Sequence, residues 1–190
     1  MNNKIRYTPV NLHKDTSDNF DVLRSNDTQL NRRNFLRSLV SMYELDLSNL
    51  RDIALDTLIA KYKTTGKLEI MKIIPLIDYY PSIRENGKLN ENNPNRYTFL
   101  QLLRYTINNL FEYLEIPNNY FEDPRWNDFK RTFDIRNRLM HPKTNTNLDI
   151  NNDEMKFIVN GWKWWIDLEV SIIKNYRKFN FEDGIRNNIL

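Results

Sequence analysis

The chain has 190 residues, of which 40% are hydrophobic and 28% charged, and its formal net charge is +3. This length fits one domain with enough apolar material for a core, and the composition is ordinary for a soluble protein. No apolar run approaches the roughly 18 residues that a membrane span needs, and we find no signal-peptide core. The lack of cysteine excludes disulfides, thiolate metal sites and cysteine catalysis. We therefore expect a cytoplasmic protein.

The first half of the chain predicts an arm followed by two helices. Segment 1–27 is polar and shows no helical periodicity, so we expect a loosely packed amino-terminal arm there. Apolar residues then recur at spacings of three and four from Leu36 to Leu58, which predicts a long helix that stops at Gly66. A shorter apolar segment follows. It contains Pro75, which favours a kinked or short helix.

Two further helices are predicted in the middle of the chain. The apolar pattern from Phe99 to Leu114 marks the first of them. The second begins at Asp123, which offers an N-cap acceptor and is followed by a proline suited to a first helical position. It ends shortly before Pro142, because the residue before a proline is displaced from the helical region.

A last long helix begins at a cap formed by Asn151 or Asn152, with acidic residues in its first turn that suit its positive end. We expect Trp164 to lie off its buried face and to serve a dimer contact or RNA. The helices together predict an all-α fold, a single bundle of four to five main helices over 28–180 with a tail over 181–190. The predicted buried face of the last helix consists of Met155, Ile158, Val159, Trp162, Trp165, Ile166, Val170, Ile173 and Tyr176.

Three polar residues stand out at the end of the helix before Pro142. Arg136 lies on one flank of its buried stripe, Asn137 lies on the other, and His141 follows Asn137 by one turn. Each alone has a structural explanation, because arginine snorkels and histidine suits a helix end, but polar groups beside a buried stripe need partners. We therefore treat the three as a candidate site. The stripe itself consists of Trp126, Phe129, Phe133 and Met140.

The candidate site lies in the most basic part of the chain. Between positions 130 and 143 the only acidic residue is Asp134. The wheel places Arg131 and Arg138 on the solvated face. A basic cluster of this kind permits an RNA partner without requiring one. The cations that we expect to bind RNA are Lys130, Arg131, Arg138 and Lys143.

The string DIRNRLMHP resembles the motif of the HEPN superfamily of ribonucleases. That motif consists of an arginine, a polar residue directly after it, and a histidine after four to six intervening residues. In this chain Arg136, Asn137 and His141 occupy the three positions, with four residues between the arginine and the histidine. The likeness extends over the helical body, 28–180, with an aromatic helix before the motif and a long helix after it.

The resemblance implies a homodimer in which two copies of the motif face one cleft and cut RNA without a metal or another cofactor. His141 would move a proton to or from the ribose 2′-hydroxyl or the leaving oxygen, and Arg136 would neutralise the phosphate in the transition state. Asn137 would orient the imidazole or hold a phosphate oxygen. The family also implies a toxin or phage-defence effector with an antitoxin or another defence partner.

Some features set limits on this interpretation. One branch of the family modifies a tyrosine two residues after the histidine, but this chain has Lys143 there, which argues against regulation by AMPylation. Glu44 is a candidate for an acidic partner, although it also suits a solvated position. A zinc site is not expected, because neither His13 nor His141 has a carboxylate at ligand spacing. The alternatives are a non-catalytic HEPN-fold module that binds RNA or protein, and a helical scaffold with a coincidental motif.

Overall fold

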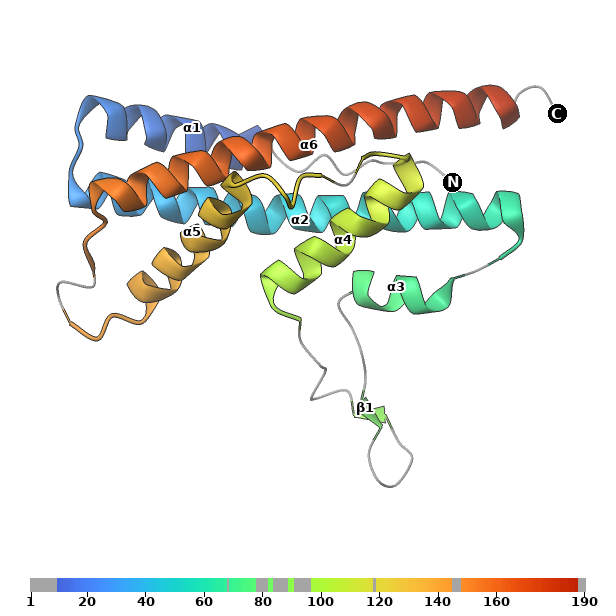
Figure 1. Cartoon of the computed structure of the whole chain (residues 1–190), viewed down its shortest axis with the longest axis horizontal. Coiled ribbons are helices and arrows are strands. Elements are labelled where there is room, and N and C mark those ends of the chain that lie inside the picture. Colours follow the sequence, from blue (N-terminus) through green and yellow to red (C-terminus); the bar gives the residue numbers. More distant parts are fainter. Residues whose placement is uncertain are drawn as a thin grey trace. The chain divides into compact units, whose positions relative to one another are not determined.

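The computed structural model describes residues 10–67, 69–77, 82–83, 89–90, 97–117, 119–144 and 148–187. Over these ranges the regular structure is helical except for one pair of two-residue strands, which confirms the predicted all-α class (Figure 1). None of the described helices is long and apolar enough to cross a membrane. The elements are α1 (Val10–Ser25), α2 (Gln29–Thr65), α3 (Ile70–Leu76), the antiparallel strands β1 (Ser82–Ile83) and β2 (Leu89–Asn90), α4 (Phe99–Leu114), α5 (Arg125–Met140) and α6 (Asn152–Asn187).

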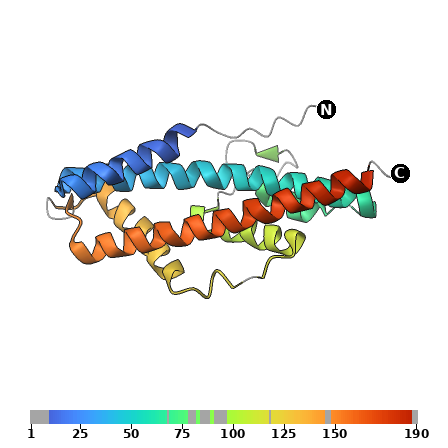
Figure 2. The ribbon, with the colours of Figure 1, turned by 90° about the horizontal axis from the view of Figure 1, so that it is seen from above.

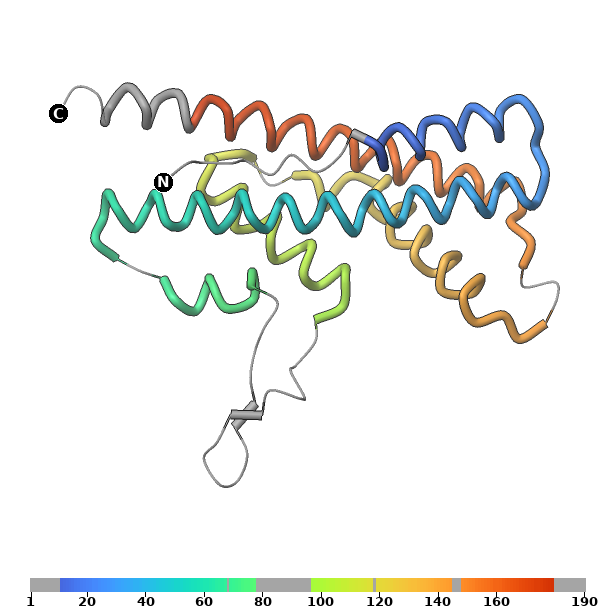
Figure 3. Tube along the Cα trace, turned by 180° about the vertical axis from the view of Figure 1, so that it is seen from behind, coloured from blue at the N-terminus to red at the C-terminus, as the bar shows by residue number. Residues whose placement is uncertain are grey.

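The described residues belong to two compact units. The first unit contains the described residues of segments 1–46 and 119–173, and the second contains the described residues of segments 47–118 and 174–190. Helices α2 and α6 contribute residues to both units, and the coloured part of each can be followed along the trace in Figure 3. Because α6 reaches Asn187, much of the tail expected from the sequence is helical.

Helix α1 is the largest difference from the sequence analysis. The sequence predicts an arm over 1–27, but Val10–Ser25 form a helix that lies along α2 (Figure 2). In this helix Phe20 packs edge-on against Trp162 of α6, with the ring centroids 5.2 Å apart. The fully buried residue Thr16 interrupts the apolar stripe, and its hydroxyl donates to the carbonyl oxygen one turn earlier at 2.8 Å. Because Thr16 is polar but buried, the apolar residues of α1 show only a weak helical periodicity in the sequence.

Aromatic rings from three helices form the centre of the first unit. Tyr43 of α2, Phe129 of α5 and Trp165 of α6 are all fully buried. Phe129 stacks on Trp165 at a centroid distance of 5.5 Å and an interplanar angle of 5°, and the Tyr43 ring lies 5.0 Å from each. Aromatic pairs of this kind contribute about 0.5–1.5 kcal/mol beyond their buried area. The stack therefore fixes α5 against α6.

Helix α6 buries a face that is rotated from the predicted one. Trp165 is buried as predicted, but Ile166 and Val170 are 41% and 60% exposed. Trp164, which the wheel places off the buried face, is fully buried, and its indole N–H donates to the carbonyl oxygen of Tyr120 at 2.9 Å. The predicted roles of Trp164 in a dimer or RNA contact are therefore wrong. The physical reason is that both α2 and the chain leading into α5 cover this helix, which widens its buried face.

In the second unit, α3 and α4 pack side by side (Figure 1). Tyr105 donates to the carbonyl oxygen of Lys72 at 3.1 Å, and Tyr113 donates to Glu69 at 2.9 Å. The Lys72 ammonium also contacts Glu112 at 2.7 Å. Burial and the hydrogen bond to Glu69 raise the pKa of Tyr113 to about 12. This phenol therefore stays protonated and holds the two helices together.

Several helix ends follow signals that the sequence carries. Helix α2 stops at Gly66, which has φ +68°, a left-handed conformation that glycine adopts without strain. Pro75 lies in the last turn of the short helix α3. Helix α4 begins with a capping box formed by Thr98 and Gln101, and it ends at Glu115 with φ 54°.

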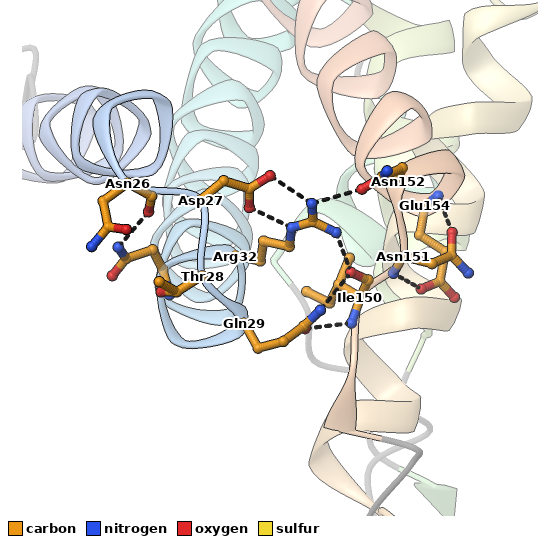
Figure 4. A network of polar contacts seen from close by, with 10 residues as sticks. Asn26, Asp27, Thr28, Gln29, Arg32, Ile150, Asn151, Asn152 and Glu154 are labelled. Atoms are coloured by element: carbon orange, nitrogen blue, oxygen red, sulfur yellow. Dashed lines mark hydrogen bonds and ion pairs between the residues drawn. The ribbon is translucent and has the colours of Figure 1, made fainter.

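The start of α6 is joined to the start of α2 by the polar network of Figure 4. Asn151 caps α6, because its Oδ1 accepts the backbone N–H of Glu154 at 2.9 Å. Gln29 exchanges two hydrogen bonds with the backbone of Ile150, at 3.1 and 2.8 Å, and Arg32 donates to the same carbonyl oxygen at 2.6 Å. These contacts anchor the chain shortly after the predicted motif.

Candidate active site at the end of helix α5

The end of α5 agrees with the sequence prediction, whereas its N-cap residue is Pro124 and not the predicted Asp123. At its start the Asp123 carboxylate accepts the backbone N–H of Arg125 at 2.8 Å. At its end His141 is the C-cap residue with φ −130° and ψ 60°, outside the helical region, and Pro142 follows it. The motif therefore occupies the last turn of α5 and the residue directly after it.

Arg136 is oriented by two neighbours. One guanidinium nitrogen donates to Asn137 Oδ1 at 3.2 Å, and the other lies 3.7 Å from Glu44 Oε1 of α2. The side chains of Arg136 and Glu44 are 37% and 53% exposed, so solvent screens the ion pair and it contributes little to stability. The guanidinium is therefore held only loosely at the surface.

His141 is exposed and lies close to the same amide residue. Its backbone N–H donates to the carbonyl oxygen of Asn137 at 3.1 Å. Asn137 therefore contacts Arg136 through its side chain and His141 through its backbone. In the described part of the chain the imidazole makes no hydrogen bond or ion pair.

One member of the predicted buried stripe of α5 is exposed. Trp126, Phe129 and Phe133 are buried as predicted, but Met140 is 54% exposed. Ile135 is buried at 6% exposure, although the wheel does not include it in the stripe. The prediction for Met140 is wrong because the last turn of α5 faces solvent. The same fact makes the motif accessible.

Arg138 is not the solvated surface charge that the helical wheel predicts. Its side chain is 30% exposed, and one guanidinium nitrogen donates to both carboxylate oxygens of Glu154, at 2.8 and 2.9 Å. The other donates to the carbonyl oxygen of Asp149 at 2.9 Å. Arg138 therefore joins α5 to the start of α6. The helical wheel does not reveal this, because both partners come from residues that follow α5 in the chain.

The other cations predicted to bind RNA keep more freedom. Arg131 is 55% exposed, and its guanidinium lies over the ring of Phe157 at 4.5 Å. The Lys130 ammonium lies 5.6 Å from the centroid of the Trp126 ring. Lys143 is exposed, two residues after the histidine of the motif. These three side chains can reach phosphates more readily than Arg138 can.

The pairing of Arg138 with Glu154 predicts a measurable coupling in stability. We expect Arg138→Gln and Glu154→Gln each to lower the free energy of unfolding. The loss in the double variant should be smaller than the sum of the two single losses by about 0.5–1 kcal/mol. Glutamine at 154 retains an acceptor for the N–H of Asn151, which donates to Glu154 at 3.0 Å, so the helix cap is kept. Urea unfolding of the four proteins measures the coupling. Strictly additive changes would contradict the pairing.

His13, the second histidine, has partners that the sequence does not indicate. Its Nε2 lies 2.9 Å from Asp46 Oδ1. His13, Asp46 and Glu169 each have one side-chain atom that could bind a metal, and these three atoms lie within 4.8 Å of one another. His13 therefore has carboxylate neighbours in space, although none stands at ligand spacing in the sequence. The carboxylates come from α2 and α6, so sequence spacing gives no sign of them.

Comparison of the chain with protein-family models, curated proteins and solved structures finds no match. At the end of α5 an accessible guanidinium, a carboxamide and an imidazole lie within six consecutive residues.

Proposed function

We propose that the chain is a HEPN-type endoribonuclease that cleaves RNA without a metal ion. The observation that carries the proposal is the link through Asn137, which contacts the guanidinium of Arg136 and the backbone N–H of His141. Asn137 and His141 are exposed and Arg136 is partly exposed, which is compatible with access of a phosphodiester. These residues also form the pattern that resembles the HEPN motif.

In the proposed reaction the ribose 2′-oxygen forms a bond to the adjacent phosphorus while its proton passes to a base. The bond from phosphorus to the 5′-oxygen of the next nucleotide breaks, and that oxygen takes up a proton from an acid. The products are a 2′,3′-cyclic phosphate and a 5′-hydroxyl. An imidazole exchanges protons near neutral pH, so His141 serves one of these steps. In a homodimer the His141 of the second copy would serve the other.

Arg136 stabilises the phosphate as negative charge builds up on its oxygens. Glu44 holds the guanidinium at the surface before RNA binds, and Asn137 sets its orientation. In the proposal, Arg131 and Lys143 contact flanking phosphates. Arg138 instead holds the chain after the motif through Glu154.

The biological role that we propose is a toxin or phage-defence effector acting on RNA in the cytoplasm. A partner protein, such as an antitoxin, would then control it. This role follows from the family resemblance, and the basic segment that contains the motif is compatible with an RNA partner.

End-group analysis of RNA tests the proposed function. We expect the purified protein to fragment RNA in the presence of EDTA and to leave 2′,3′-cyclic phosphate and 5′-hydroxyl ends. Salt-dependent RNA binding without cleavage would contradict the enzyme and support the non-catalytic HEPN-fold module. Neither binding nor cleavage would leave a helical scaffold as the remaining explanation.

A further inference from the structure

A second cluster of reactive side chains lies in the first unit, apart from the motif. His13 of α1, Asp46 of α2 and Glu169 of α6 each offer one ligand-type atom, and the three atoms lie within 4.8 Å of one another. Glu44 of α2 faces the motif, and Asp46 follows it by two residues. On a helix this separation turns the side chain by about 200° around the axis. The cluster therefore lies on a different side of α2 from the motif.

Asp46 is the fixed centre of this cluster. It is 1% exposed, its Oδ1 lies 2.9 Å from His13 Nε2, and its Oδ2 accepts the indole N–H of Trp165 at 3.1 Å. A buried carboxylate needs such partners, because burial without them is costly. Since Trp165 belongs to the aromatic core, it holds the orientation of the carboxylate.

The second carboxylate increases the negative charge in this enclosed place. Burial, and then the charge of Asp46, raise the pKa of Glu169 to about 7. The hydrogen bond to Asp46 raises the pKa of His13 above its ordinary value. The charge of Asp46 contributes to both shifts, because it disfavours a second negative charge on Glu169 and favours a positive charge on His13.

A buried hydroxyl near the cluster is also left without a partner. The Tyr43 hydroxyl makes no hydrogen bond, although its ring is fully buried. Burial and the charge of Asp46 raise its pKa, so the phenol lies within the electrostatic reach of that carboxylate. Tyr43 and Asp46 are three residues apart in α2 and thus lie on one helix face.

We propose that His13, Asp46 and Glu169 bind a divalent first-row transition metal such as Zn²⁺. One imidazole nitrogen with carboxylate oxygens is a donor set that zinc accepts, and the imidazole disfavours Mg²⁺ and Ca²⁺. The His13 side chain is 47% exposed, which gives an ion access from solvent and leaves room for water ligands. The proton on Nε2 leaves to solvent when the ion binds, since only the neutral ring coordinates.

The proposed ion would hold α1 against the rest of the first unit, an effect that we call the clamp. Its ligands come from three helices, so binding would join α1 to α2 and α6. The free energy of binding would then stabilise this helix against local opening. This role is independent of the proposed ribonuclease, which uses residues on another side of α2 and needs no ion.

Calorimetric titration of chelator-treated protein with Zn²⁺ tests the proposal. We expect one ion per chain and much weaker binding of Mg²⁺. Removing one ligand by His13→Gln or Glu169→Gln is expected to weaken Zn²⁺ binding at least about tenfold, since even second-shell changes cost 10–100-fold. The matched control is His141→Gln, which removes the only other imidazole of the chain and should leave binding unchanged.

A structural measurement separates the clamp from adventitious binding. Zn²⁺ should slow hydrogen exchange of the α1 amides in the wild type and not in His13→Gln. Because the His13 side chain is half-exposed, this variant is expected to fold, and circular dichroism checks it. The proposal is overturned if wild-type protein shows no saturable binding, or if His13→Gln binds Zn²⁺ as tightly as wild type. RNA cleavage in EDTA is read separately, so either proposal can fail alone.

Discussion

Replacement of His141 by alanine is expected to lower the rate of RNA cleavage about 10²–10⁴-fold, the usual contribution of one acid–base group. The imidazole makes no hydrogen bond or ion pair with the described residues, so nothing else in the fold depends on it. The melting temperature should therefore stay unchanged. Single-turnover cleavage of a labelled RNA, with detection of the cyclic phosphate, measures the effect.

Arg136 provides the companion test. Arg136→Ala removes the charge that faces the phosphate, and we expect a loss of about 10²–10³-fold in the cleavage rate, as when one oxyanion donor is removed. Arg136→Lys keeps the charge without the planar fork and should recover part of the rate. Lys163→Ala, which removes an exposed cation of α6, is the control and should cleave normally. Full activity of His141→Ala or Arg136→Ala would show that the motif does not carry the reaction.

Gly161 predicts the largest effect on stability. A Cβ atom at this position would lie 2.7 Å from Phe129 Cα and 3.0 Å from Phe129 N. These are backbone atoms of α5, so a substitution must move one helix away from the other. We expect Gly161→Ala to destabilise the protein by about 1–3 kcal/mol through overpacking, although alanine favours the helix by about 1 kcal/mol. Gly161→Val should cost more.

Thermal and urea unfolding measure this prediction. For a chain of this size, each kcal/mol lowers the melting temperature by about 2–4 °C. Lys163→Ala in the same helix is the control, with an expected change within about 0.5 kcal/mol. An unchanged or raised melting temperature for Gly161→Ala would mean that α5 and α6 do not approach each other this closely.

The local features of the fold could be predicted from the sequence. The proline at 142 follows the end of α5, Gly66 ends α2, and an asparagine caps α6. These signals act within a few residues, so the chain itself contains them. The position of the motif at an exposed helix end follows from the same local pattern.

Features that depend on distant neighbours could not be predicted. Trp164 is buried because the chain before α5 covers it, and Arg138 is held by a carboxylate of α6. Helical periodicity shows which face is apolar, but it does not show how many elements cover that face. Asp46 and Glu169 are likewise brought to His13 only by the fold. Sequence reasoning therefore found the motif and missed the second cluster.

The place of the motif at the carboxyl end of α5 limits how a nucleic acid strand can approach it. The last carbonyl groups of a helix carry partial negative charge, which repels a phosphate that arrives along the helix axis. Arg136 lies on the side of the helix, and His141 follows its last turn. In the proposed reaction a strand would therefore cross the helix end obliquely, with a ribose turned toward the imidazole. Unpaired nucleotides can bend in this way more easily than a rigid duplex, so loops and single strands should be the preferred substrates.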